Sequence, residues 1–487
     1  MRDSQSNSPD SLSTSPASVL LDLADPSPSG RPGPLHARLA GALRSAIRDG
    51  RLRPDSALPP SRALAAELGC SRWVVTQAYA ELVTAGYLEA RTGSGTRVRP
   101  LASGDAIRLG NAIRPGAVTR PASPAASLDM APGLPDLRLF PVARWAGAIR
   151  AAAAGLSAAD LGYRDPAGHP VLREALAEYL ARVRGAAVAP GDLTVCGSAT
   201  DGIGRICRAL ARAGTTAVAV EDPGWQRVRE VAAAAGLTVV PVPVDEQGLR
   251  GELLAGLRGV GAVILTPAHQ FPSGAVLSPA RRHELLGWAR RTGALLVEDD
   301  YDAEFRYDRR AVATLQGAAP WAVTLVGSVS KTLSPAVGIG WMVSPPRLTP
   351  LLRDATPPPV LDQLAFASFL RAGSYDRHLR SARKRYRDRR DAVVAEITRR
   401  LPQARVSGIP AGLHVVVGFG PDIDCDAVQR RARTLGVRVV SLTRYQVRQG
   451  EPGLVIGYGN LADHEIATAV ESLAAAVARA GRGPVSR

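Results

Sequence analysis

The sequence contains very little lysine, little cysteine and no long hydrophobic run. Lysine and arginine together number 60, yet lysine occurs only at Lys331 and Lys384. The cysteines number four and lie far apart, with no pair at metal-ligand spacing, so we expect neither a disulfide framework nor a metal site. No apolar run long enough to cross a membrane and no charged-then-apolar signal pattern occur, so we expect a cytoplasmic protein without a membrane partner.

The chain is both long and basic. Its 487 residues exceed one ordinary domain, and a hydrophobic content of 46% is enough for a large core. The formal net charge of +16 favours a nucleic-acid partner, because a basic surface releases counterions from the phosphate backbone when it binds. An arginine-rich composition can give an ordinary enzyme the same charge, so charge alone leaves both classes open.

Changes in composition along the chain indicate its domain organisation. The expected parts are a disordered leader rich in Ser, Pro, Asp and Gly, a first compact unit, a linker and a second domain, over residues 1–32, 33–100, 101–127 and 128–480. The second domain alternates short apolar runs with amphipathic helices. That alternation is typical of an α/β domain with a largely parallel sheet.

The first compact unit has the order of elements of a winged helix-turn-helix. Apolar spacing and turn residues predict helices over 35–49 and 62–68, and a third helix that Ser71 would cap. Two short strands around a glycine-rich tip follow within 87–100. In such a domain the third helix enters the major groove of DNA.

Residues 50–98 closely resemble the GntR-type DNA-binding domain, and this resemblance identifies candidate contacts to double-stranded operator DNA. It implies DNA-contacting side chains at Arg62, Ser71, Arg72 and Thr76, and a wing shaped by Gly93 and Gly95. Arg72 is the candidate reader of a guanine edge, because guanidinium matches the O6/N7 pair; a phosphate contact is the alternative. Trp73 stands where members of this family usually carry a small residue.

In the second domain, candidate functional residues follow apolar runs that we interpret as strands. Backbone N–H groups of Ser198, Ala199 and Thr200 would face a phosphate at a helix N-terminus, although such a turn can simply start a helix. Trp225 follows another strand, where it could stack on a flat heterocycle or belong to the core. Ligands of open α/β sheets bind beyond the carboxyl ends of strands, so these positions could converge.

Two further stretches complete the set. In ALLVEDDYDAEF, Asp299 could pair with a protonated pyridine nitrogen and Tyr301 could bind a phenolate oxygen. In GSVSKTLSP, Ser328 precedes Lys331, and a desolvated lysine can attack a carbonyl whereas guanidinium cannot. An exposed lysine without a function is the alternative, and Lys384 in RKRYRDRR fits it. Binding of pyridoxal 5′-phosphate requires all of these groups: a phosphate-binding turn, a stacking ring, an acid for the ring nitrogen, a hydroxyl for the ring oxygen and an amine for the aldehyde.

The order and the sequences of these stretches resemble those of fold type I aminotransferases. Together with the first domain, they resemble the MocR subgroup of GntR-type regulators. The resemblance covers about 34–475 and includes FPVARW, GYRDPAGHPVLREALAEYL, HQFPSG, EDDYDAEFRY, SKTLSP and AGLH. It implies a multidomain protein, a winged helix-turn-helix followed by an α/β aminotransferase-like domain. The implied large subdomain covers about 160–345, and the small one about 128–159 and 346–480.

The resemblance also implies a role for each residue. Lys331 would form the Schiff base with pyridoxal 5′-phosphate, Asp299 would hold the ring nitrogen, and Tyr301 would meet the ring hydroxyl oxygen. Trp225 would stack on the ring. The residues implied at the phosphate are Ser198, Ala199, Thr200 and Ser328, with Tyr163 reaching the phosphate of the partner subunit in a homodimer.

The sequence departs from the family pattern at two places. Gly338 stands where members usually carry an arginine that binds the cofactor phosphate, and 454–456 offer no arginine for a substrate carboxylate. Arg227 matches a position that some members use for an effector carboxylate; a surface ion pair is the alternative. We therefore expect a transcriptional regulator that uses the cofactor as cofactor or effector, with weak or absent transaminase activity. An active aminotransferase and a regulator without cofactor are the alternatives.

Overall fold

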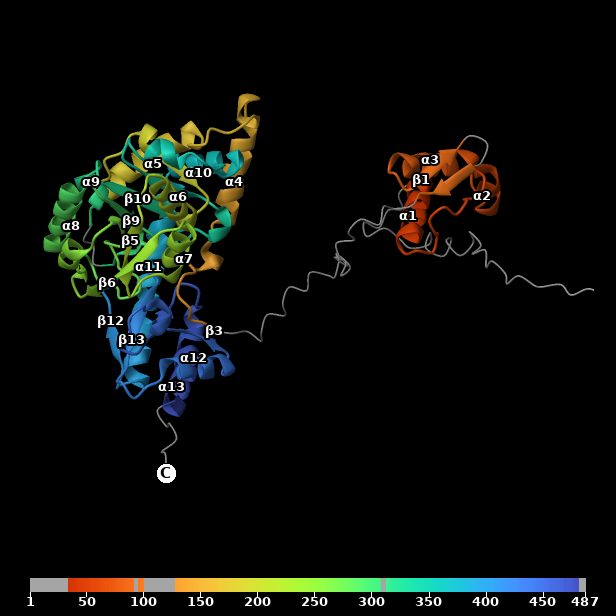
Figure 1. Cartoon of the computed structure of the whole chain (residues 1–487). Helices are drawn as coiled ribbons and strands as arrows, with labels where there is room; N and C mark the ends of the chain where they lie inside the picture. Colours follow the sequence, from red (N-terminus) through yellow and green to blue (C-terminus); the bar gives the residue numbers. More distant parts are fainter. Residues whose placement is uncertain (1–33, 92–94, 100–127, 308–311, 481–487) are drawn as a thin grey trace, which may run out of the picture. The chain divides into compact units, whose positions relative to one another are not determined.

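The computed structural model describes residues 34–91, 95–99, 128–307 and 312–480. These residues form two compact units, one before and one after 100–127 (Figure 1). The leader and the linker expected from composition lie outside the described residues and stay predictions. Within the described ranges, no helix is both long and apolar enough to cross a membrane.

The first unit is a winged helix-turn-helix, as the sequence predicts. Its elements are α1 (Leu35–Arg48), α2 (Ser61–Glu67), α3 (Arg72–Thr84), β1 (Leu88–Arg91) and β2 (Gly95–Val98). The two strands pair antiparallel, with Leu88 opposite Val98. One buried face of α3 joins the core through residues spaced three and four apart, which are Val75, Ala78, Tyr79 and Leu82.

The second unit is built on an eight-stranded sheet in the order β4-β11-β10-β9-β8-β5-β6-β7. The strands are β4 (Leu193–Cys196), β5 (Ala217–Asp222), β6 (Thr238–Asp245), β7 (Gly248–Leu249), β8 (Val260–Leu265), β9 (Leu295–Asp299), β10 (Val323–Ser328) and β11 (Gly340–Val343). Strands β6, β5, β8, β9 and β10 run parallel. Strand β11 is antiparallel to both of its neighbours, β10 and β4.

Helices cover both faces of this sheet, which explains why its central strands are mostly apolar up to the polar residues at their carboxyl ends. Val218 and Val220 of β5 pack in one cluster with α6 (Ala199–Arg212) and α7 (Gln226–Ala234). Ala217 and Ala219, which point the other way, pack with α8 (Pro279–Thr292). The remaining helices of this part are α4 (Val142–Ala154), α5 (Pro170–Arg184), α9 (Leu315–Ala318) and α10 (Val360–Arg371).

The end of the chain forms a separate lobe, drawn in blue in Figure 1, which we call the C-terminal lobe (residues 405–480). Its four-stranded antiparallel sheet has the order β12-β13-β16-β15. The strands and helices of the lobe are β12 (Arg405–Ser407), β13 (His414–Gly418), α12 (Cys425–Thr434), β14 (Val437–Arg438), β15 (Val440–Ser441), β16 (Gly453–Gly457) and α13 (Ile466–Ala480). The long helix α11 (Ser374–Arg400) leads into it, and β3 (Leu128–Asp129) pairs with β14.

The expected division into subdomains stays a prediction. Helix α4 falls in the expected small subdomain, and it packs on α10. Helix α10 also packs on α5, which falls in the expected large subdomain. The segment before residue 160 therefore contacts elements on both sides of the expected boundary.

Candidate functional site

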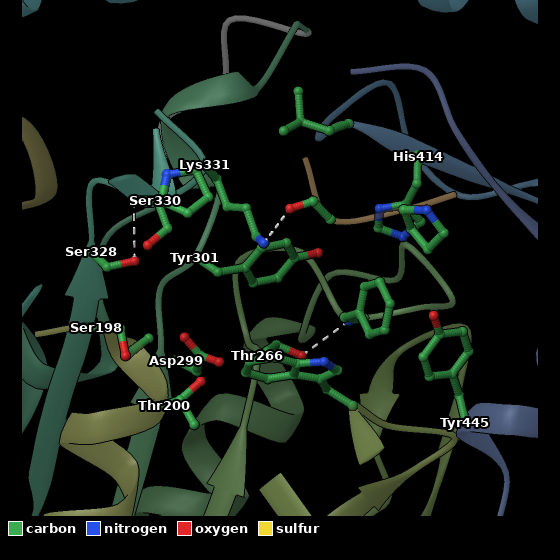
Figure 2. A pocket seen from close by; sticks show the side chains of 17 residues that line it. Ser198, Thr200, Thr266, Asp299, Tyr301, Ser328, Ser330, Lys331, His414 and Tyr445 are labelled. Carbon is green, nitrogen blue, oxygen red and sulfur yellow. Dashed lines mark hydrogen bonds between the residues drawn. The ribbon is translucent and has the colours of Figure 1, made fainter. Parts of the chain in front are cut away.

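A cavity of about 300 Å³ lies where the parallel strands end (Figure 2). Of the cofactor residues that the sequence predicts, those that line it are Ser198, Ala199, Thr200, Trp225, Asp299, Tyr301, Ser328 and Lys331. Residues that sequence reasoning did not assign also line it, namely Thr266, Phe271, Ser330, Leu413, His414 and Tyr445. The fold thus brings together groups that are separated by more than two hundred positions in the chain.

Lys331 enters the cavity three residues after the end of β10. Its amine donates a hydrogen bond to the backbone carbonyl of Gly133 (Figure 2). Burial lowers the pKa of the Lys331 ammonium, and the nearby carboxylates of Asp299 and Asp302 act in the opposite direction. Lys331 is therefore more easily deprotonated than an exposed lysine, as a nucleophilic amine requires.

Asp299 is the last residue of β9, and its side chain is an unsatisfied buried acid. It is 5% exposed, and its Oδ1 has no hydrogen-bond partner among the described residues. Burial raises the pKa of Asp299 to about 7, and the neighbouring Asp300 adds to the shift. A buried polar atom without a partner is costly, so this oxygen is suited to a cationic ring N–H of a bound molecule.

Tyr301 is held by a buried histidine and acid. Its hydroxyl lies 3.1 Å from Nδ1 of His269, and the same nitrogen lies 2.8 Å from Oδ2 of Asp302. The rings of Tyr301 and His269 are stacked with centroids 6.1 Å apart. Burial raises the pKa of Tyr301 well above its ordinary value, so the phenol keeps its proton at neutral pH and can donate it in a hydrogen bond.

The N-terminus of α6 forms a cradle of hydroxyl and backbone N–H groups. Ser198 is the N-cap of this helix, and its Oγ accepts the N–H of Asp201 at 3.1 Å. The hydroxyls of Ser198, Thr200, Ser328 and Ser330 gather at one side of the cavity in Figure 2. Hydroxyls at a helix N-terminus are suited to a phosphate group.

The cradle contains no fixed positive charge. Among the described residues that line the cavity, Lys331 is the only lysine or arginine. Arg205, further along α6, is held by Asp201 at 2.8 Å and does not line the cavity. Gly338 has a φ of 63°, and no heavy atom lies within 4 Å of the position that a Cβ would occupy. A Cβ at this position would meet no neighbour, but the left-handed backbone would be strained for any residue other than glycine.

Tyr445 and His414 bring the C-terminal lobe to the cavity. His414 begins β13, and its Nε2 lies 3.0 Å from the carbonyl oxygen of Pro272. The loop that carries Tyr445 is tied to the end of β5, because Asp222 accepts the N–H groups of Val447 at 2.8 Å and Arg448 at 3.1 Å. The lobe therefore closes one side of the cavity through fixed contacts.

Two of the predicted residues do not line the cavity. Arg227 lies exposed on α7 and pairs with Glu230 at 2.9 Å, which is the surface ion pair that the sequence left open as its alternative. Tyr163 is fully exposed in this single chain. Such exposure leaves its side chain accessible to another molecule, and the assignment of Tyr163 to a partner subunit stays a prediction.

The described candidate DNA contacts come from α2 and from the beginning of α3. Arg62, Ser71, Arg72 and Thr76 are all exposed. The Arg72 Nε donates to Ser61 Oγ at 3.3 Å, which holds the guanidinium between the starts of α2 and α3. Ser71 stands at the N-cap position of α3, but its side chain makes no capping hydrogen bond, so its hydroxyl is available to a ligand.

Trp73 of α3 and Gly95 of the wing are exposed as well. Trp73 is 59% exposed, and its ring meets the ring of His36 from α1 edge-on, with centroids 5.5 Å apart. Gly95 begins β2 with a φ of 84°, a conformation that favours glycine. Gly93 lies outside the described residues, so its role in the wing stays a prediction.

The two domains match two families of known proteins. Residues 131–473 match "Aminotransferase class I and II", and residues 35–98 match "Bacterial regulatory proteins, gntR family". The chain is 31% identical over 453 residues to the HTH-type pyridoxine biosynthesis transcriptional regulator PdxR of Corynebacterium glutamicum, covering 91% of this chain and 96% of that one. It is 32% identical over 473 residues to the probable rhizopine catabolism regulatory protein MocR of Rhizobium meliloti, covering 91% and 94%.

Solved structures show the same fold for the second domain. An archaeal alanine:glyoxylate aminotransferase superposes with a TM-score of 0.68 at 22% identity, covering 72% of this chain and 91% of that one. This protein belongs to the MocR and PdxR type of HTH transcriptional regulators, in which a GntR-type domain precedes an aminotransferase-like domain of fold type I.

Proposed function

We propose that this protein is a DNA-binding transcriptional regulator whose aminotransferase-like domain binds pyridoxal 5′-phosphate through Lys331, as cofactor or effector. The observation that supports the proposal is that one cavity is lined by both Lys331 and Asp299, whose buried Oδ1 has no hydrogen-bond partner among the described residues. The C. glutamicum relative is named as a regulator of pyridoxine biosynthesis, and this name supports a connection with pyridoxal 5′-phosphate, which is chemically related to pyridoxine.

Each side chain of the cavity has a definite part in this proposal. When bound, the cofactor supplies an electrophilic aldehyde carbon and an electron-withdrawing ring. Lys331 would hold the aldehyde carbon, Asp299 the ring nitrogen and Tyr301 the ring oxygen. Trp225, which is 36% exposed at the cavity, offers an aromatic face to the ring. The neutral cradle at Ser198–Thr200 would hold the phosphate through hydroxyl and N–H groups alone.

The first domain supplies the DNA contacts, and we propose that the active form is a homodimer in the cytoplasm. The exposed stripe Arg72, Trp73 and Thr76 on α3 would face the major groove. Tyr163 would contribute to the partner subunit's cavity, which its full exposure in one chain permits. The dimer would have two geometries that differ in their affinity for DNA. The cofactor can shift the balance between these geometries by no more than the difference between its own affinities for the two.

The two lysines of the chain provide a matched test. We expect the full-length protein to absorb in the visible range after addition of pyridoxal 5′-phosphate, Lys331→Ala to lose this absorbance, and Lys384→Ala to keep it, because Lys384 is exposed on α11. The measurement is an absorbance titration. A colourless wild-type protein, or a Lys331→Ala protein that retains the absorbance, would overturn the proposal.

An active aminotransferase is the second candidate, and the shared cavity of Lys331, Asp299 and Tyr301 favours it. Efficient turnover also needs a group that holds the substrate carboxylate, and the described lining residues include no arginine. We expect weak or no transfer of amino groups from a panel of amino acids to 2-oxoacids. Turnover at rates ordinary for enzymes, of about 1 per second or more, would favour this second candidate.

A further inference from the structure

His414 and Tyr445 lie at the side of the cavity opposite the hydroxyl cradle (Figure 2). Together with Phe271, which also lines the cavity, they form a surface that we call the aromatic wall. The ring of Phe271 meets that of His414 at a centroid distance of 5.0 Å and that of Tyr445 at 4.9 Å. His414 and Tyr445 come from the C-terminal lobe, whereas Phe271 comes from the loop after β8. The three rings support one another edge-to-face, so this wall has a defined shape.

The structure behind the aromatic wall is apolar as well. Val455, in the late strand β16, is completely buried and packs in one cluster with Val416 and Tyr445. Phe271 packs against the same cluster. The strand that lacks an arginine at 454–456 therefore presents hydrocarbon to the back of the wall, and no described arginine replaces the missing charge at the cavity surface.

Among the described residues that line the cavity, Asp299 is the only carboxylic acid and no arginine is present. Asp302 and Glu221 do not line the cavity, but both lie close enough to raise the pKa of Asp299. Burial lowers the pKa of His414 to about 4, with a further contribution from His269, so His414 is neutral at pH 7. A ligand carboxylate would face the acid Asp299 and a neutral imidazole with no lining arginine to pair with, whereas an ammonium group would face Asp299 and aromatic rings.

We propose that the effector of this cavity is a small primary amine with an apolar group and no carboxylate. This inference deepens the proposed function, on which it rests, by naming the chemical class of the effector. The amine would direct its nitrogen toward Lys331 and Asp299, and its apolar group toward Phe271 and Tyr445. It has to be small, because a cavity of about 300 Å³ also holds the cofactor.

Isobutylamine and valine test the proposal because they differ only by the carboxylate. We expect isothermal titration of the full-length protein, with and without added pyridoxal 5′-phosphate, to give a Kd for isobutylamine at least about tenfold lower than for valine. An uncompensated carboxylate in a buried acidic site costs at least that factor. Equal or tighter binding of valine, or no binding of either compound, would sink the proposal.

The same titration separates this inference from the proposed function. A protein that shows no visible absorbance with pyridoxal 5′-phosphate but still prefers isobutylamine contradicts the proposed function and supports the charge selectivity of the cavity. A protein that becomes coloured and prefers valine contradicts the inference and leaves the proposed function standing.

Two arginine substitutions test whether the aromatic wall determines the preference for isobutylamine over valine. Tyr445→Arg adds a cation to the wall, and we expect it to remove or reverse the tenfold preference for isobutylamine. Val447→Arg adds the same charge two residues away, where the side chain is 52% exposed and outside the cavity, and the preference should persist. Equal effects of both variants would show that the wall is not the determinant. If circular dichroism shows Tyr445→Arg to be unfolded, the wild-type comparison of the two compounds still decides.

Discussion

The exposed surface of α3 and the cavity of the second domain differ in how much their functional side chains lower the stability of the fold. Arg72, Trp73 and Thr76 extend into solvent from a helix whose other face supplies the core. Asp299 is buried and Lys331 is half-buried, and their pKa values shift in opposite directions because desolvation disfavours both charged forms. The DNA-binding surface is thus nearly free of strain, whereas the cavity stores unfavourable desolvation energy that a ligand can release.

The largest expected effect that tests this comparison is the pH dependence of stability at Asp299. Its pKa is about 7 in the folded chain and near 3.8 when unfolded. Between about pH 4 and 7 the folded state holds a proton that the unfolded chain has lost, so this group's contribution to stability falls as pH rises. The fall is up to about 1.4 kcal/mol per pH unit. Asp299→Asn, which does not titrate, should therefore lose less stability than wild type across this window.

The measurement is the urea midpoint of the cofactor-free full-length protein at pH 5 and pH 7.5, followed by circular dichroism. Asp422→Asn, which changes an exposed acid of the C-terminal lobe, is the control and should keep the wild-type dependence. An Asp299→Asn protein with the wild-type dependence would mean that the buried carboxyl does not carry the expected strain.

The second expected effect is on DNA affinity. Arg72→Ala should weaken binding by about 1–3 kcal/mol and relax the preference at one base pair, because a bidentate contact to guanine is lost. Mobility shifts against DNA selected by the wild-type protein from a random pool measure both changes. Arg53→Ala, which changes an exposed arginine outside α3, is the control. A weaker but equally selective Arg72→Ala protein would identify a phosphate contact instead.

The smallest expected effect is on the stability of the first domain. Trp73→Ala should change the free energy of unfolding by less than about 0.5 kcal/mol, because the indole is mostly exposed. Leu82→Ala, on the buried face of the same helix, should cost about 2–5 kcal/mol. Thermal melting monitored by circular dichroism compares the two variants. A large loss of stability in Trp73→Ala would mean that the contact with His36 is structural.

The fold was largely predictable because its signals are local. Apolar residues three and four apart give the helices of the first unit, and acids or small residues at the ends of apolar runs mark the carboxyl ends of strands. Lys331, Asp299 and Ser198 could be assigned to one site because parallel strands end at the same edge of a sheet. The family resemblance added the role of each residue.

The aromatic wall could not be predicted in the same way. Phe271, His414 and Tyr445 meet only because the C-terminal lobe folds back onto the sheet, and no spacing in the chain records that contact. The motif HQFPSG contains Phe271 and the motif AGLH contains His414. A loop and the beginning of a strand do not by themselves indicate that their side chains line a ligand site. The hydrogen bond between Tyr301 and His269 joins positions 32 apart and was equally hidden.

Gly338 also has a consequence for the evolution of this chain. Every glycine codon is one base change away from an arginine codon, so a single mutation could place an arginine beside the phosphate cradle. The left-handed backbone at Gly338, with a φ of 63°, would burden the new residue with about 1–2 kcal/mol of strain. A lineage that acquired an arginine at this position would therefore lose stability unless another change offset the strain.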